Sequence, residues 1–224
     1  MTISNITYTI TGGYQNMIGV YNYSVIVTYL GVALSVIGMV FSFNGYFEYA
    51  VLCLALAGAC DTFDGKIARA MKNRTEEMII FGVQIDSLCD MVCFGVTPAV
   101  LAYNMGLQRP WGSGVEIIFV ICGAIRLAYF NVLEELKKKV PPSDAPKYFR
   151  GLPITTITII FPVVYLFHPY VKQEVFMLIL GVAMLLTAFF YVFDIKIKKP
   201  GNGGIAIMMV FVTLVMLKVL NILR

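Results

Sequence analysis

The chain has 224 residues, of which 59% are hydrophobic and only 13% are charged, and its mean hydropathy is +0.81. A soluble globular domain is about 45–50% apolar and about 25% charged, so this composition excludes an ordinary soluble domain. The net charge is +4, and the basic residues gather at the ends of apolar segments. We therefore predict an all-α, polytopic membrane protein with no nucleic-acid partner.

The hydropathy pattern predicts about six to eight transmembrane helices, because the apolar segments recur at close to the 20 residues that a bilayer requires. In chain order, the predicted helices are 23–43, 46–70, 79–104, 114–135, 152–169, 173–194 and 204–223. Residues 1–21 are expected to form an N-terminal tail. Residues 22–224 are expected to form a single membrane domain.

Lysine and arginine are distributed unevenly between the predicted connections. Most of the 17 basic residues lie in the regions 66–74, 126–150 and 196–199. The excess of positive charge predicts that these regions, and the N-terminal tail, face the cytoplasm of a multi-pass cell-membrane protein. Within the second region, residues 134–151 contain three prolines and three consecutive lysines, which predicts a loop.

Four acidic residues interrupt the helical hairpin expected over residues 46–104. Asp61 and Asp64 are three residues apart, and Asp86 and Asp90 are four apart. On a helix, each spacing places both side chains on one face. If the chain reverses near residues 73–77, antiparallel packing brings all four carboxylates to a similar depth. Converging carboxylates in a low-dielectric setting repel one another unless they are protonated or neutralised by a cation.

The four acids offer oxygen ligands, which favour Mg²⁺, Mn²⁺ or Ca²⁺ over Zn²⁺ or copper. We predict a site for Mg²⁺ or Mn²⁺ that holds two ions and that Ca²⁺ can also occupy. Gly65, Ala68 and Gly82 leave room for a ligand beside the helix backbones, and Arg69 suits a phosphate group. These features describe a diphosphate site with bound metal. By themselves, the same acids would also suit an ion-translocation site.

Eight residues stand in one spaced pattern: Asp61, Asp64, Gly65, Ala68, Arg69, Gly82, Asp86 and Asp90. This pattern resembles the signature of the CDP-alcohol phosphotransferases, which are membrane enzymes that use a CDP-linked donor and two divalent ions. The segment between Arg69 and Gly82 is longer than is usual in that family. The additional residues fall within 72–80, at the predicted turn, where extra length is tolerated.

Further segments resemble one group within that family, the integral-membrane phosphatidylserine synthases of bacteria and archaea. They are residues 81–100, 126–132 and 148–155, and the whole resemblance covers about residues 22–155. Tyr129 departs from the group, which more often has arginine there. The resemblance implies transfer of a phosphatidyl group from CDP-diacylglycerol to L-serine, with release of CMP. It also implies a homodimer embedded among membrane lipids.

The resemblance implies a role for each matching residue. Asp61, Asp64 and Asp86 would bind the metal ions, while Asp90 would contribute to binding and act as the general base for the serine hydroxyl. The CDP and diphosphate pocket would be formed by Asp61, Gly65, Ala68, Arg69 and Gly82. The candidates for binding the serine carboxylate are Arg126, Asn131, Lys147 and Arg150.

Three alternatives remain open at this point. In the first alternative, the enzyme uses a different acceptor alcohol, such as glycerol phosphate or inositol phosphate. In the second, the acids belong to a divalent-cation transporter. A transporter should continue its polar path across the bilayer, yet the outer halves of the second and third predicted helices contain only Glu48 as an ionisable acid. The third alternative makes the acids structural, with Arg126 as a counter-ion, since a charge within a span is costly without a partner.

Overall fold

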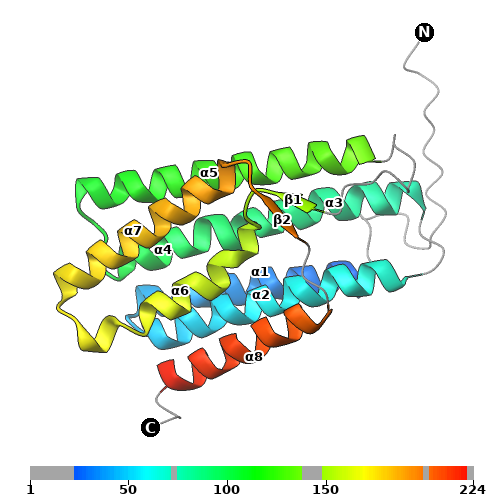
Figure 1. The fold of residues 1–224 in the computed structure, drawn as a ribbon. Coiled ribbons are helices and arrows are strands. Elements are labelled where there is room, and N and C mark those ends of the chain that lie inside the picture. Colours follow the sequence, from blue (N-terminus) through cyan, green and yellow to red (C-terminus); the bar gives the residue numbers. More distant parts are fainter. Residues whose placement is uncertain (1–22, 72–74, 138–147, 199–201, 221–224) are drawn as a thin grey trace.

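The computed structural model describes residues 23–71, 75–137, 148–198 and 202–220. These residues form a bundle of helices with a small two-stranded sheet (Figure 1). The predicted N-terminal tail, residues 1–21, lies outside the described residues.

A helix lies at each predicted position, with ends that differ by a few residues. The α-helices are α1 (Tyr23–Phe43), α2 (Phe47–Ala70), α3 (Glu76–Asp90), α4 (Thr97–Asn104), α5 (Pro110–Lys137), α6 (Ile157–Tyr165), α7 (Gln173–Val192) and α8 (Asn202–Val219). The short 3-10 helices η4 (Ile154–Thr156) and η5 (His168–Tyr170) flank α6. In the bundle, α1 packs on α2 and α4, α5 packs on α7, and α8 packs on α2 and α6.

Within the described residues, four helical segments are long and apolar enough to cross a membrane. They are Val25–Phe43, Glu76–Asn104, Pro110–Leu136 and Gln173–Val192. Ile154–Tyr170 and Met208–Val219 are shorter apolar helical segments. The chain is therefore a helical protein with several membrane-crossing segments.

The second helix of the predicted hairpin begins earlier than the hydropathy suggested. The Thr75 hydroxyl accepts a hydrogen bond from the Met78 N–H at 3.2 Å and caps the first turn of α3. Glu76 and Glu77 occupy that turn, where negative charge interacts favourably with the helix dipole. Polar capping therefore extends α3 into a stretch that hydropathy alone had left outside the span.

A π-helical segment, η2 (Met91–Val96), joins α3 to α4 directly after Asp90. Pro98 follows it and has no backbone N–H to continue a regular hydrogen-bond ladder. The Thr97 hydroxyl donates to the Val92 carbonyl at 2.9 Å and supplies a hydrogen bond inside this irregular turn. The sequence analysis did not predict this segment, which changes the helix register next to the acidic cluster.

The prediction of a loop over residues 134–151 is wrong at both ends of that segment. Helix α5 continues to Lys137, and β1 (Tyr148–Arg150) pairs antiparallel with β2 (Lys196–Lys198), so that Arg150 lies opposite Lys196. The fold is therefore helical with one short ribbon rather than purely α. Three-residue strands depend on a partner distant in sequence, so local composition carries no signal for them.

Candidate active site

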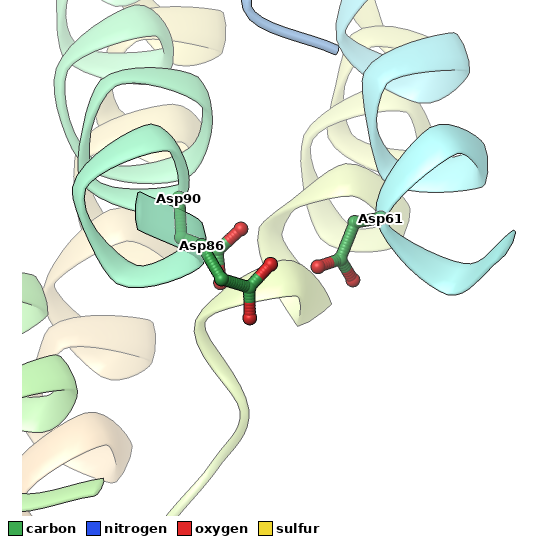
Figure 2. Close-up of side chains that lie close together, drawn as sticks. All are labelled: Asp61, Asp86 and Asp90. Atoms are coloured by element: carbon green, nitrogen blue, oxygen red, sulfur yellow. The ribbon is translucent and has the colours of Figure 1, made fainter. Parts of the chain in front are cut away.

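The hairpin brings three of the four predicted acids together. Asp61 projects from α2 toward Asp86 and Asp90 of α3 (Figure 2). Each residue offers a carboxylate oxygen, and these three atoms all lie within 4.8 Å of one another. Asp86 and Asp90 are one helical turn apart, so the antiparallel arrangement aims both at the facing helix.

Asp64 lies beside this group but turns toward a different neighbour. Its side chain is only 4% exposed, and its Oδ2 accepts a hydrogen bond from the Thr28 hydroxyl of α1 at 2.6 Å. Asp64 lines the same cavity as Asp61 and Asp86. Three of the four carboxylates therefore form the closest group, and Asp64 lies on the same cavity wall with a hydrogen bond to α1.

A cavity of about 380 Å³ opens beside the acids, within the usual size range of small-ligand pockets. Its polar wall includes threonines 155, 156 and 158, which follow Pro153. Its apolar wall includes Met208, Met209 and Val212 of α8. The cavity therefore combines a charged part with an apolar side, as an amphiphilic ligand requires.

Arg126 forms part of the wall of this cavity. Its side chain is 5% exposed, and its Nε donates to the Leu152 carbonyl at 2.9 Å. Among the described residues, its buried Nη1 has no hydrogen-bond partner. A buried guanidinium normally has all its donors paired, so this atom is available to an anionic ligand group. These contacts give no support to Arg126 as a counter-ion of the aspartates.

The segment that Arg126 binds is held in place by the end of α7. Gly151 has a φ of +74°, and a Cβ there would lie 2.9 Å from the Tyr191 carbonyl oxygen. Its N–H donates to the Ile195 carbonyl at 2.8 Å, and the Leu152 N–H donates to the Phe190 carbonyl at 3.0 Å. Only glycine fits this left-handed, close-packed turn comfortably, which fixes the position of the carbonyl that Arg126 contacts.

Two other predicted acceptor-binding residues, Asn131 and Arg150, are not part of the described cavity wall. Asn131 is half-buried, and its Oδ1 accepts a hydrogen bond from the Ser87 hydroxyl at 2.7 Å. Arg150 is exposed, and its Nη1 donates to the Tyr129 hydroxyl at 3.2 Å. That hydrogen bond raises the pKa of the Arg150 guanidinium above its usual range. Lys147 lies outside the described residues.

The structure describes the positions of only some of the predicted CDP-binding residues relative to the cavity. Gly65 lines the cavity together with Asp61, whereas Gly82 lies half-buried on α3 and does not belong to that wall. Ala68 and Arg69 belong to α2, but their side chains lie outside the described part of the structure.

Sequence reasoning missed several residues of the cavity wall, and it missed Thr28, which contacts the cavity residue Asp64. Thr28, the threonines of 155–158 and the methionines of α8 were not assigned to the site. A threonine within an apolar span is a polar exception, and this signal could have drawn attention to Thr28 and Thr158. For Met208 and Met209 the sequence carries no such signal, because methionine is common in apolar helices.

The donor set of the site fits a hard divalent cation. Three carboxylates converge within the reach of one ion, and all of their donor atoms are oxygens. Mg²⁺ and Mn²⁺ prefer this chemistry, whereas Zn²⁺ and copper favour nitrogen or sulfur ligands. Asp61, Asp86 and Asp90, with Asp64 on the adjoining cavity wall, would supply the ligands for such an ion, and it would offset their mutual repulsion.

Comparison with known families matches nearly the whole chain. The family model for CDP-alcohol phosphatidyltransferase matches residues 21–222, well beyond the region 22–155 that carried the resemblance in the sequence. The protein therefore belongs to the CDP-alcohol phosphatidyltransferase family.

Individual relatives are similar over shorter stretches. A CDP-diacylglycerol–serine O-phosphatidyltransferase of Saccharomyces cerevisiae is 40% identical over 112 residues, which are 49% of this chain and 39% of that protein. An archaetidylserine synthase of Methanothermobacter thermautotrophicus is 30% identical over 153 residues, 68% of this chain and 61% of that protein. A CDP-diacylglycerol–serine O-phosphatidyltransferase of Methanocaldococcus jannaschii is 32% identical over 143 residues, 63% and 60% respectively. The chain thus spans less than two thirds of each of these relatives.

The convergence of the acids on the cavity predicts a large loss of metal affinity when Asp86, which lines the cavity, is neutralised. Asp86→Asn should weaken Mn²⁺ binding by about 10-fold or more, because it removes a charged oxygen ligand. Titration of Mn²⁺ into the purified protein, followed by the electron paramagnetic resonance of the free ion, measures the affinity.

The matched control is Glu116→Gln. Glu116 is a half-buried carboxylate of α5 outside the cavity wall, so this variant should bind Mn²⁺ as the unmodified protein does. Equal affinities for the two variants would contradict the metal site.

Proposed function

We propose that this protein is a phosphatidylserine synthase, which transfers the phosphatidyl group of CDP-diacylglycerol to L-serine and releases CMP. One observation carries the proposal: a cavity holds carboxylates at one part of its wall and, at another, the guanidinium of Arg126, whose buried Nη1 has no partner among the described residues. Membership of the family supports the reaction type. The names of the similar proteins support serine, or a closely related amino-acid acceptor.

In the proposed reaction, the serine hydroxyl oxygen attacks the phosphorus atom that carries the diacylglycerol. A new phosphorus–oxygen bond to serine forms as the bond to the CMP oxygen breaks, and CMP leaves with that electron pair. The hydroxyl proton passes to the Asp90 carboxylate. A bound Mg²⁺ or Mn²⁺ would neutralise the diphosphate oxygens and the negative charge on the departing CMP.

The four acids have different roles in this proposal. Asp61, Asp64 and Asp86, which all line the cavity, would hold the metal ions that neutralise the diphosphate. Asp90 lies close to Asp61 and Asp86. In the proposal Asp90, the last acid of the motif, contributes to the metal site and acts as the general base when the serine hydroxyl comes within hydrogen-bond reach. Gly65, Ala68, Arg69 and Gly82 border the CDP group in the same proposal.

Arg126 is the proposed partner of the serine carboxylate. A guanidinium and a carboxylate form a strong, directional pair, and burial strengthens it. Asn131, Lys147 and Arg150 are secondary candidates for the same carboxylate. Arg150 does place a cation on the hydroxyl of Tyr129, at the position where the resembling synthases more often have arginine.

The membrane arrangement follows from the charges. We propose that α2, α6 and α8 also cross the bilayer, to give the seven spans expected from the sequence, and that the basic connections face the cytoplasm. The acyl chains of the donor would lie along the apolar cavity wall of α8, and the head group would lie at the acids. A homodimer remains a prediction of the family resemblance.

The direct test is CMP release from CDP-diacylglycerol by the purified protein, with and without L-serine. We expect release that requires both serine and Mg²⁺ or Mn²⁺ and that EDTA abolishes. Release that requires glycerol phosphate or inositol phosphate instead would keep the reaction type and reject serine. No release with any of these acceptors would reject the proposal, and Mn²⁺ uptake into vesicles would then identify a transporter.

Replacing the proposed base should separate binding from turnover. Asp90→Asn should retain metal-dependent binding of CDP-diacylglycerol but lose at least about 100-fold in turnover, since general-base catalysis contributes roughly 10²–10⁴-fold. Equilibrium binding of the donor and the rate of CMP release measure the two effects. Near-normal turnover would show that Asp90 is not the base.

The two arginines should behave differently when each is replaced by glutamine. Arg126→Gln should raise the KM for L-serine by roughly 10–100-fold, because a hydrogen bond to a charged group is worth about 1.5–3 kcal/mol. The KM for CDP-diacylglycerol should change much less. Arg150→Gln is the comparison variant, since Arg150 is exposed and bound to Tyr129, and its effect on this KM should be smaller. An unchanged KM for serine in Arg126→Gln, or an effect no larger than that of Arg150→Gln, would reject Arg126 as the main partner of the carboxylate.

A further inference from the structure

Helix α1 contributes a side chain to the acidic site, although none of the eight motif positions lies on it. The Thr28 hydroxyl donates to Asp64 Oδ2 at an oxygen–oxygen distance of 2.6 Å. This distance falls within the range of charge-assisted bonds between a hydroxyl and an ionised carboxylate, about 2.5–2.7 Å. The two residues are 36 positions apart in the chain, so the contact exists only because α1 packs against α2.

A row of small residues produces that packing. Gly31, Ser35 and Gly38 follow Thr28 at spacings of three and four, which place all four on one face of α1. A Cβ at Gly38 would lie 3.0 Å from the Cys53 Cβ, and one at Gly31 would lie 3.6 Å from the Cys60 Cβ. Larger side chains would separate the helices, so this face sets the distance at which Thr28 meets Asp64.

The hydrogen bond restricts how Asp64 presents its carboxylate. A carboxylate has two oxygens and about four lone-pair sites, and Thr28 occupies one of them on Oδ2. The carboxylate plane is thereby held in one orientation, while Asp64 still lines the cavity. Outer partners of this kind orient the ligands of metal sites and increase their affinity for the ion.

We infer that Thr28 is a positioning residue of the metal site, which holds the Asp64 carboxylate in the orientation that binds a divalent cation. The inference rests on the proposed role of Asp64 as a metal ligand. It adds a residue of α1 to a site otherwise built on the hairpin of α2 and α3. The small-residue face of α1 then serves the site as well as the fold.

The test compares Thr28→Val, which keeps the shape and removes the donor, with Thr28→Ser, which keeps the donor. Thr28→Val should weaken Mn²⁺ binding by about 10–100-fold, the usual effect of losing an outer partner, whereas Thr28→Ser should bind as the unmodified protein does. Binding is measured by the paramagnetic resonance of free Mn²⁺, with full-length protein in detergent and no lipid substrate. Thr28→Ala removes the same donor with a smaller side chain and should reproduce the loss.

A second measurement separates positioning from general damage to the fold. For Thr28→Val, the Mn²⁺ concentration that gives half-maximal CMP release should rise by the same factor as the dissociation constant, and saturating Mn²⁺ should restore most of the rate. A rate that is low at every Mn²⁺ concentration would mean a structural role and would overturn the inference. Thr213→Val is the matched control, because the Thr213 hydroxyl is exposed and donates to the Met209 carbonyl of its own helix.

Asp64→Asn distinguishes failure of this inference from failure of the proposed function. If Asp64→Asn weakens Mn²⁺ binding and Thr28→Val does not, the positioning role is wrong and the metal site stands. If neither substitution changes the affinity, Asp64 is not a ligand, and both the inference and the proposed role of Asp64 are rejected.

Discussion

The convergence of several half-buried carboxylates within an apolar bundle is the constraint on which the rest of this structure depends. An uncompensated buried charge costs several kcal/mol, and like charges a few ångströms apart add their repulsion. Asp61, Asp86 and Asp90 nevertheless converge within 4.8 Å. These carboxylates can remain this close only when a cation or bound protons reduce the repulsion between them. The unfavourable grouping of these acids on α2 and α3 is therefore best explained by a role in binding a ligand.

The surrounding backbone is arranged to hold these charges at a defined separation. Helix α3 begins at a capped turn on Thr75 and passes into a π-helical segment directly after Asp90. Pro98, in the first turn of α4, has no N–H to donate to the preceding turn, and π-helical turns are frequent at functional sites. On the facing side, α2 approaches α1 through small residues. The site therefore has rigid helical supports rather than mobile loops.

The opposite wall of the cavity carries the complementary charge. Arg126 is buried, is anchored to the Leu152 carbonyl, and keeps one nitrogen without a protein partner among the described residues. The turn at Gly151 and the ribbon of β1 and β2 fix that anchor from the end of α7. In the proposed reaction, the anionic part of the wall suits a donor that binds through its diphosphate and a metal ion. The cationic part suits an acceptor that carries a carboxylate. The apolar side at α8 suits the lipid part of the same donor.

The sequence by itself determined the helical class, the approximate ends of the helices and the placement of Asp61, Asp86 and Asp90 on facing surfaces. These features depend on local hydropathy, helix periodicity and one chain reversal, all of which act over short stretches. The tertiary structure alone decided that Asp64 binds Thr28, that Arg126 rather than Arg150 lines the cavity, and that residues 148–150 pair with 196–198. Each of these outcomes joins residues far apart in the chain, and packing between elements selects among partners that local sequence leaves equivalent.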